Sequence, residues 1–203
     1  MNKPVKILFL AASPTDQTRL RVDEEMRSID QALRQAESRD KFEIEQHFAV
    51  RAADLLGYLL RHQPHIVHFS GHGNESSEII LEDNDGYSHP ISAQALSKLF
   101  SVLKDNIRCV VLNACYSEKQ APAIVQHIDC VIGMSKKIRN SAAISFATAF
   151  YQALGFGRDI KTAFDLGCVQ IEFENLDEQD TPQLLTLNKK PSEIFLVQEV
   201  FLK

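Results

Sequence analysis

Short, almost wholly apolar runs alternate with longer segments of helical period, and this alternation restricts the fold more than any other feature of the chain. Four of these runs are too short for a helix and too apolar for a surface strand. They cover residues 5–10, 66–69, 108–112 and 130–134. Runs of this kind are typical of buried strands, so the pattern predicts an α/β layer fold.

The segments between these runs have the spacing of amphipathic helices. In the first of them Val22, Met26, Ile29 and Leu33 recur every three or four residues and form one apolar stripe. Helices are expected over residues 22–36, 52–62, 93–104, 141–154 and about 158–173. Ser92 is placed to cap the third of these helices at its N-terminus.

Other segments favour peripheral strands and loops. Residues 42–50 alternate as an outer strand would, and residues 78–90 resemble a hairpin that turns at Asn84-Asp85-Gly86. The glycines around His72 predict a tight loop over residues 70–74. Edge strands are expected at 182–185 and 194–201, and the second could pair with another chain.

Length and charge exclude several classes of protein. The chain has 203 residues, with 44% hydrophobic and 24% charged residues, and neither a repeat nor a linker, which predicts one domain over residues 1–203. A net charge of −5 argues against a protein that holds nucleic acid or an anionic membrane. The apolar run at the N-terminus is too short for a membrane span and is expected to be a strand instead of a signal peptide.

The cysteines indicate a reducing compartment. There are four, at positions 109, 115, 130 and 168, and none forms a CxxC pair. A chain of this length with so few, scattered cysteines is typical of a cytoplasmic protein.

Two predicted core strands end in loops with reactive side chains. The strand at 66–69 leads to His72, between two glycines, and the strand at 108–112 leads to Cys115. The helix predicted at 93–104 is the crossover that parallel neighbours require. Because the carboxyl ends of parallel strands share one edge of the sheet, we expect His72 and Cys115 to meet there.

A cysteine beside a histidine is suited to nucleophilic catalysis. An imidazolium lowers the pKa of a neighbouring thiol from its usual value of about 8.5, and the resulting thiolate can attack a peptide carbonyl. The imidazole then carries the proton to the leaving amine. The backbone N–H groups of Gly73 and Cys115 are candidates to stabilise the oxyanion. This chemistry requires no metal and no organic cofactor.

Other side chains are candidates for supporting this site. His68, Ser70 and Asn113 lie in or at the end of the two strands and could brace the dyad. Candidates for a pocket that recognises the substrate are Asp83, Asp85, Glu118 and Asn140. Of these, the three acidic residues would suit a basic substrate side chain. For them, a solvated loop is the simpler interpretation.

The segments 66–73 and 110–115 resemble the histidine and cysteine motifs of the CHAT domain family, relatives of caspases, separases and gingipains. Further similarity lies at 131–134, 142–147, 150–154, 160–164 and 181–185. The resemblance implies a three-layer α/β/α sandwich with a mostly parallel sheet, and it maps the proton-shuttling histidine to His72 and the nucleophile to Cys115. It departs at Arg139-Asn140-Ser141, where many members carry an acidic residue; here Asn140 would cap the late helix.

The resemblance also implies a biological role. Members of this family cleave protein or peptide substrates and are typically effectors that a sensor module or partner protein switches on, often in antiviral defence or regulated cell death. The sequence contains no sensor domain, so the activating partner is expected to be a separate protein, unless the chain is a fragment.

Several alternatives remain open from the sequence alone. Cys115 could be a core residue, as Cys109, Cys130 and Cys168 are expected to be. The histidines at 62, 65, 68 and 72 have a spacing like that of metal ligands, although Pro64 interrupts any helix through them. The loop at 11–15 could bind phosphate in a flavodoxin-like manner. The domain could also be a catalytically silent scaffold that binds a partner protein.

Overall fold

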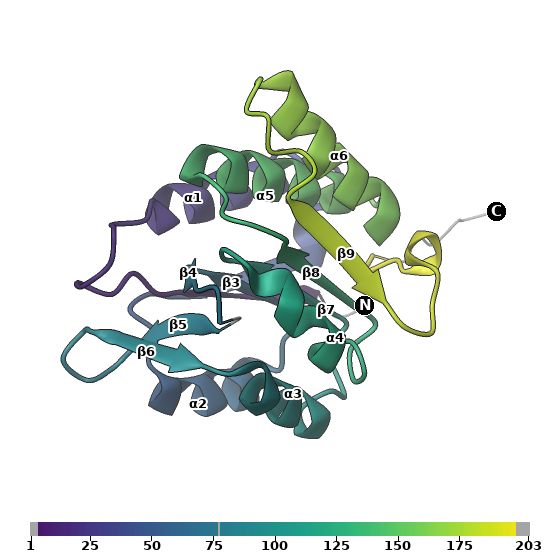
Figure 1. The fold of residues 1–203 in the computed structure, drawn as a ribbon. Helices are drawn as coiled ribbons and strands as arrows, with labels where there is room; N and C mark the ends of the chain where they lie inside the picture. Colours follow the sequence, from purple (N-terminus) through teal and green to yellow (C-terminus); the bar gives the residue numbers. More distant parts are fainter. Residues whose placement is uncertain (1–3, 77, 198–203) are drawn as a thin grey trace.

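A six-stranded sheet forms the centre of the molecule in the computed structural model, which describes residues 4–197 apart from residue 77 (Figure 1). Its strand order is β2-β1-β3-β7-β8-β9, and all neighbours are parallel except β9, which runs antiparallel to β8. The strands are β1 (Val5–Ala11), β2 (Phe42–His47), β3 (Ile66–Ser70), β7 (Cys109–Asn113), β8 (Cys130–Met134) and β9 (Pro182–Thr186).

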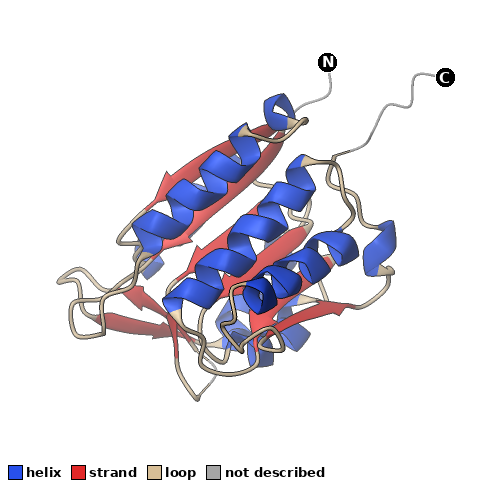
Figure 2. Cartoon of the chain, turned by 90° about the horizontal axis from the view of Figure 1, so that it is seen from above, coloured by secondary structure: helices blue, strands red, loops and turns tan. Residues whose placement is uncertain are grey.

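Helices cover both faces of this sheet. One layer contains α1 (Val22–Arg34), α5 (Asn140–Gly155) and α6 (Ile160–Phe173), which lie over the sheet and run roughly along the direction of its strands when the molecule is seen from above (Figure 2). The other layer contains α2 (Ala52–His62), α3 (Ala93–Val102) and the short α4 (Ala121–Ile124). Single 3-10 turns lie at Arg39–Lys41, Ser117–Gln120 and Pro191–Glu193. The predicted three-layer sandwich is confirmed.

Alternate side chains of the strands enter two separate cores. On β1, Ile7 and Phe9 pack under α1 and α5, whereas Leu8 and Leu10 face the opposite layer. Because both faces are covered, the central strands have no polar face, which is why the sequence shows them as continuous apolar runs.

A small antiparallel sheet lies beside the main one. It consists of β4 (His72–Gly73), β5 (Ile79–Glu82) and β6 (Ser88–Ile91), in that order. The β5–β6 hairpin was expected from the sequence and is confirmed. The tight loop expected over residues 70–74 is instead partly strand, because the chain leaves β3 and pairs His72 with Ile80.

Several boundaries differ from the sequence-based expectation. The outer strand β2 ends at His47, because Ala49 adopts a left-handed backbone with φ of 53°. Residues 194–197 form no strand, and Ile194 is buried where its carbonyl accepts a hydrogen bond from Ile160 N. The remainder of the strand expected there lies outside the described residues.

The start of α5 also corrects an expectation. Asn140 is the first residue of the helix, and Arg139 holds the capping position without a side-chain cap. By contrast, Ser92 caps α3 as expected and accepts a hydrogen bond from Ala95 N at 3.2 Å. Among the helices of the described residues, none has the length and apolar character needed to cross a membrane.

Candidate active site

The carboxyl ends of β3 and β7 are direct neighbours. Ser70 pairs with Asn113 in parallel register, and the Gly71 N–H donates to the Asn113 carbonyl at 3.3 Å. The segments that follow β3 and β7 remain in contact beyond this pair, because a Cβ atom at Gly73 would lie 2.0 Å from the Cys115 carbonyl oxygen. The loops that carry His72 and Cys115 therefore lie side by side, as parallel neighbouring strands predicted.

The His72 ring is half-buried and held in one orientation. Its Nε2 lies 2.8 Å from the carbonyl oxygen of Thr18. A carbonyl only accepts, so Nε2 carries the hydrogen and Nδ1 is the basic nitrogen of the neutral ring. Burial lowers the pKa of His72, opposed by the Thr18 hydrogen bond and the Asp16 charge.

The loop that carries Thr18 is held against the β5–β6 hairpin by its neighbouring residues. The Asp16 carboxylate accepts hydrogen bonds from Ser88 N at 3.0 Å and Ser88 Oγ at 2.8 Å. Thr15 N also donates to the Gly86 carbonyl at 2.9 Å. No sequence pattern predicts this arrangement, because a backbone carbonyl can come from any residue type.

Cys115 lies half-buried in the turn after β7, at the amino end of the 3-10 turn Ser117–Gln120. Ser117 fixes this turn, because its Oγ donates to the Leu112 carbonyl at 2.7 Å and accepts from Met134 N at 2.9 Å. The segment after β8 contacts the same turn, and the Cys115 thiol is 3.9 Å from the Ile138 carbonyl.

The three residues expected to brace the dyad are buried beneath it. They surround a carboxylate that the sequence analysis missed, that of Glu25 on α1, which is only 4% exposed. The contacts are His68 Nε2 to Glu25 Oε1 at 2.8 Å, Ser70 Oγ to Oε2 at 2.5 Å and Asn113 Nδ2 to Oε1 at 2.6 Å. The sequence feature that could have revealed Glu25 is its position, because an acidic residue there lies on the core-facing stripe of the 22–36 segment.

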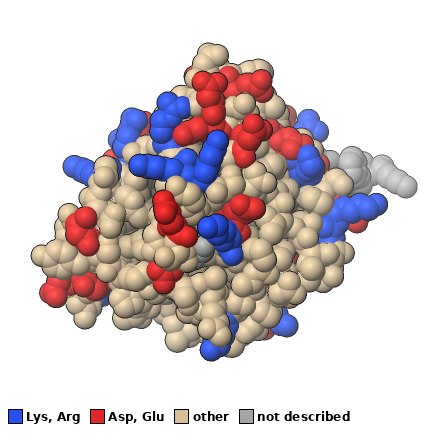
Figure 3. Space-filling model, viewed as in Figure 1, with Lys and Arg blue, Asp and Glu red and all other residues tan. Residues whose placement is uncertain are grey.

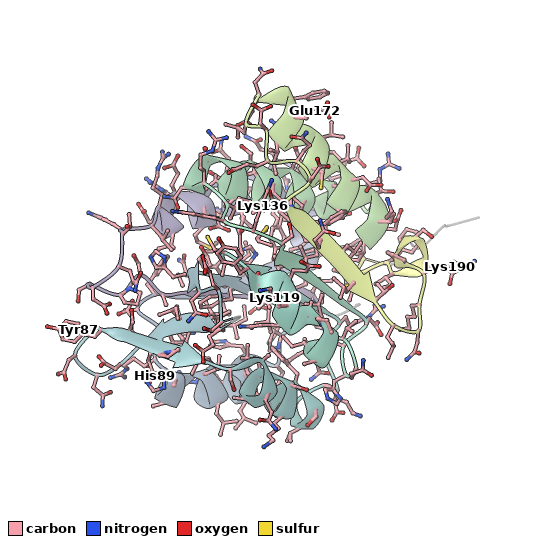
Figure 4. The ribbon with its side chains drawn as sticks, viewed as in Figure 1. Tyr87, His89, Lys119, Lys136, Glu172 and Lys190 are labelled. Carbon is pink, nitrogen blue, oxygen red and sulfur yellow. The ribbon has the colours of Figure 1, made fainter. Side chains whose placement is uncertain are left out.

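The candidate pocket residues do not form one group. Asp83 stabilises its own turn: its Oδ1 accepts from the N–H groups of Asp85 and Tyr87 at 2.9 Å, and these bonds lower its pKa. In Figure 4 Tyr87, on the same hairpin, lies well away from Lys119 and Lys136. Glu118 is half-buried, and its backbone packs against Gly133, in the turn that follows Cys115.

In the structure the residues of both alternative ligand sites, the histidine series considered for metal and the loop at 11–15 considered for phosphate, have other partners. The four histidines of the predicted ladder have separate partners: His62 contacts His47, His65 accepts from Lys6 N, His68 contacts Glu25 and His72 contacts Thr18. Within the described part of the chain, no three His, Cys, Asp or Glu side chains gather as a metal site. At the loop considered for phosphate, the Ser13 N–H already donates to the Glu82 carboxylate at 2.9 Å.

The other cysteines are packing residues. Cys109 and Cys130 are fully buried partners on β7 and β8, and the hydrogen bond to Cys109, together with burial, raises the pKa of Cys130. Burial raises the pKa of Cys168 to about 12. A thiol with so high a pKa is almost entirely protonated at neutral pH.

The surface charge is mixed. On the face shown in Figure 3, lysine and arginine side chains lie among aspartates and glutamates, without a continuous basic surface.

Comparisons with known proteins agree with this architecture. The Roc-COR-CHAT protease of an unknown prokaryotic organism is 33% identical over 162 residues, which is 76% of this chain and 15% of that protein. A probable protease of Gillisia limnaea is 26% identical over 173 residues, which is 83% of this chain and 31% of that protein. The chain thus spans less than a third of the length of either relative.

Solved structures share the fold at low sequence identity. The Arg-specific cysteine proteinase gingipain R has a TM-score of 0.65 at 12% identity, with 94% of this chain and 47% of that chain covered. Caspase-1 from Spodoptera frugiperda has a TM-score of 0.60 at 11% identity, with 91% and 86% covered. The sequence profile of the CHAT domain matches residues 3–183, and the chain therefore belongs to the CHAT domain family.

Proposed function

We propose that this chain is a cysteine endopeptidase in which Cys115 is the nucleophile and His72 the general acid and base. The observation that carries the proposal is the direct packing of the Gly73 backbone on the Cys115 backbone, which joins the two loops at the end of the sheet. Membership of the CHAT family and the names of its protease relatives support the same activity.

In the proposed reaction the thiol proton passes to His72 Nδ1, the nitrogen that the Thr18 hydrogen bond leaves basic. The Cys115 thiolate attacks the peptide carbonyl carbon and forms a tetrahedral oxyanion. The C–N bond then breaks, and the imidazolium returns its proton to the leaving amine. The acyl group stays on Cys115 as a thioester, which water activated by the same histidine hydrolyses, so that the carboxylic acid leaves and the free thiol is restored.

Backbone N–H groups of Gly73 and Cys115 are the proposed oxyanion donors. Among the described residues the Cys115 N–H has no hydrogen-bond partner of its own, and it is therefore able to donate to a substrate oxyanion. The absent side chain at position 73 lets the Cys115 backbone approach closely, which brings the two proposed donors near each other. Removal of such a donor typically costs on the order of 10²–10³ in turnover.

Site-resolved alkylation with iodoacetamide between pH 5 and 9 tests the dyad without knowledge of the substrate. We expect Cys115 to react first, to stay reactive below pH 7, and to lose this advantage in His72→Ala. Cys168 is an internal reference, because its pKa of about 12 keeps it slow over the whole range. If Cys115 is no faster in the wild-type protein than in His72→Ala, the dyad is not assembled in the isolated chain; the same test with the activating partner present then separates a latent site, which gains reactivity, from a scaffold, which does not.

Substrates are then identified from new N-termini in a protein digest. The proposal expects cleavage products with the wild-type chain in its activated form and none with Cys115→Ala under the same conditions. The chemistry of the residue before the cleaved bond would show whether Glu118, in the turn that follows Cys115, or Asn140, at the start of α5, takes part in recognition.

We also propose that the domain is an effector in prokaryotic defence or regulated cell death, acts in the cytoplasm and is switched on by another module or protein. The name of the Roc-COR-CHAT protease supports a multidomain context, and four thiols without a disulfide support a reducing compartment. Replacing the CHAT segment of that relative with this chain tests the switch. Cleavage that depends on the remaining domains is expected, whereas a constant rate would contradict it.

A further inference from the structure

One buried carboxylate contacts both strand ends that carry the proposed dyad. Glu25 Oε2 accepts from Ser70 Oγ at 2.5 Å, and Glu25 Oε1 accepts from Asn113 Nδ2 at 2.6 Å. Ser70 precedes His72 by two residues, and Asn113 precedes Cys115 by two. A single side chain from α1 therefore bridges the last paired residues of β3 and β7.

The bridge has an anchor on the side away from the dyad. Glu25 Oε1 also lies 2.8 Å from His68 Nε2, and His68 Nδ1 lies 3.0 Å from the Tyr151 hydroxyl. The Asn113 amide makes a second bond, to the Ala143 carbonyl at 3.2 Å. Within the described residues, His68 is the one basic side chain paired with Glu25. The other two side chains that donate to the carboxylate, Ser70 and Asn113, are neutral.

Besides the packing of the Gly73 backbone on the Cys115 backbone, the described residues show few directional contacts between the two strand ends. Beyond the Ser70–Asn113 pair, the backbone bond between β3 and β7 is the long one from Gly71 N to the Asn113 carbonyl, at 3.3 Å. Apolar packing fixes the register of the strands but is not directional. Short hydrogen bonds to a carboxylate are directional and stronger than bonds between neutral groups.

We infer that Glu25 is a positioning residue, whose carboxylate sets the separation of His72 from Cys115 by holding Ser70 and Asn113 together. The inference rests on the proposed function. A misplacement of about 1 Å at a catalytic pair can cost about 100-fold in rate, so a link two residues away is close enough to matter. If the carboxylate served stability alone, its loss would lower the melting temperature and leave Cys115 reactivity unchanged.

The test is the pH profile of Cys115 alkylation, measured on the full chain. Glu25→Gln keeps the shape of the side chain but directs an amide hydrogen at donors that need an acceptor. We expect it to slow Cys115 at pH 6 by about 10–100-fold, towards the rate of His72→Ala. Glu24→Gln is the matched control, because Glu24 lies on the same turn of α1 and pairs with the exposed Arg21; its profile should match the wild type.

A second pair of variants keeps the test decisive if Glu25→Gln does not fold. Ser70→Ala removes the link at the His72 strand end, whereas Tyr151→Phe removes only the distant bond to His68. Both are expected to lower the melting temperature, but only Ser70→Ala should slow Cys115. Circular dichroism at the assay temperature checks that each variant is folded.

The possible results separate the two hypotheses. If wild type and His72→Ala react alike, the proposed dyad fails and the inference fails with it. If they differ but folded Glu25→Gln and Ser70→Ala react like the wild type, the inference alone is overturned. Equal slowing by Tyr151→Phe and Ser70→Ala would also overturn it, because the cluster would then act only as general support of the core.

Discussion

Gly73 and Cys115 touch through their backbones: a side chain at position 73 would place its Cβ atom 2.0 Å from the Cys115 carbonyl oxygen and 3.3 Å from the Cys115 nitrogen. A contact of 2.0 Å with backbone cannot be relieved by a rotamer change. The geometry of the proposed site therefore depends on the absence of a side chain at this position.

Gly73→Ala is expected to separate the two loops and to slow Cys115 alkylation at pH 6 to the rate of His72→Ala. The fold should persist, because the clash lies at the edge of the sheet and outside both cores. Gly57→Ala is the control, since nothing lies within 4 Å of its added Cβ in α2. That variant should gain roughly 0.5–1 kcal/mol in urea unfolding and react like the wild type. Normal Cys115 reactivity in Gly73→Ala would contradict the site geometry.

The loop that orients His72 gives a second prediction. Asp16→Ala removes the acceptor of the two Ser88 hydrogen bonds and releases the loop around Thr18. A lost hydrogen bond to an exposed charge is worth about 0.5–1.5 kcal/mol, so kcat/KM should fall about 2–10-fold. The melting temperature should fall by only a few degrees, because the pair is exposed.

Asp23→Ala is the control for Asp16→Ala. Asp23 is also exposed, and its ion pair with Arg27 on α1 involves neither the hairpin nor Thr18. Its kcat/KM should equal that of the wild type. An equal fall in both variants would mean that net charge, and not the orientation of His72, affects the rate.

Stability is expected to decrease as the pH falls below 6.5. His65 Nδ1 accepts a hydrogen bond from Lys6 N at 3.0 Å, so this nitrogen must be unprotonated. Burial, followed by the charges of Arg108 and Lys6, lowers the pKa of His65. The unfolded chain therefore binds more protons than the folded chain below pH 6.5, and stability present above that pH is lost as the pH drops through the lower folded pKa.

Urea unfolding at pH 7.5 and 5.5 measures this loss. In His65→Asn the side-chain oxygen can accept from Lys6 N and does not titrate, so this variant should lose less stability than the wild type. It should still lose some, because the pKa values of His47 and His72 are lowered in the same direction. The exposed His89 is the control, and His89→Asn should behave like the wild type.

Substitutions at two cysteines are expected to have separate effects, one on stability and the other on activity. Cys109→Ala deletes a fully buried sulfur between β3 and β8 and should cost about 0.5–3 kcal/mol without loss of turnover. Cys115→Ala should abolish turnover with little change in melting temperature, because Cys115 lies outside both cores. Peptidase activity and thermal melts of the two variants measure this; an inactive but folded Cys109→Ala would contradict the assignment of the nucleophile.

Local periodicity predicted most of the elements well. The α2 helix and the β8 strand have the bounds that their apolar spacing indicated, and the hairpin around Asn84-Asp85-Gly86 forms as expected. These elements are defined by residues close in the chain. Expectations were wrong where distant contacts decide: β4 forms because β5 pairs with it, and Ile194 is buried against α6 instead of extending an edge strand.

The sequence by itself determined the layered fold and the two loops that carry His72 and Cys115, because burial on both faces of a sheet leaves a readable apolar run and glycine marks a tight approach. Only the tertiary structure revealed that the Thr18 carbonyl orients His72 and that Glu25 bridges Ser70 and Asn113. A backbone acceptor has no residue signature, and a carboxylate on α1 gains its partners only when that helix packs over the ends of β3 and β7. Such contacts join residues far apart in the chain, so local patterns do not encode them.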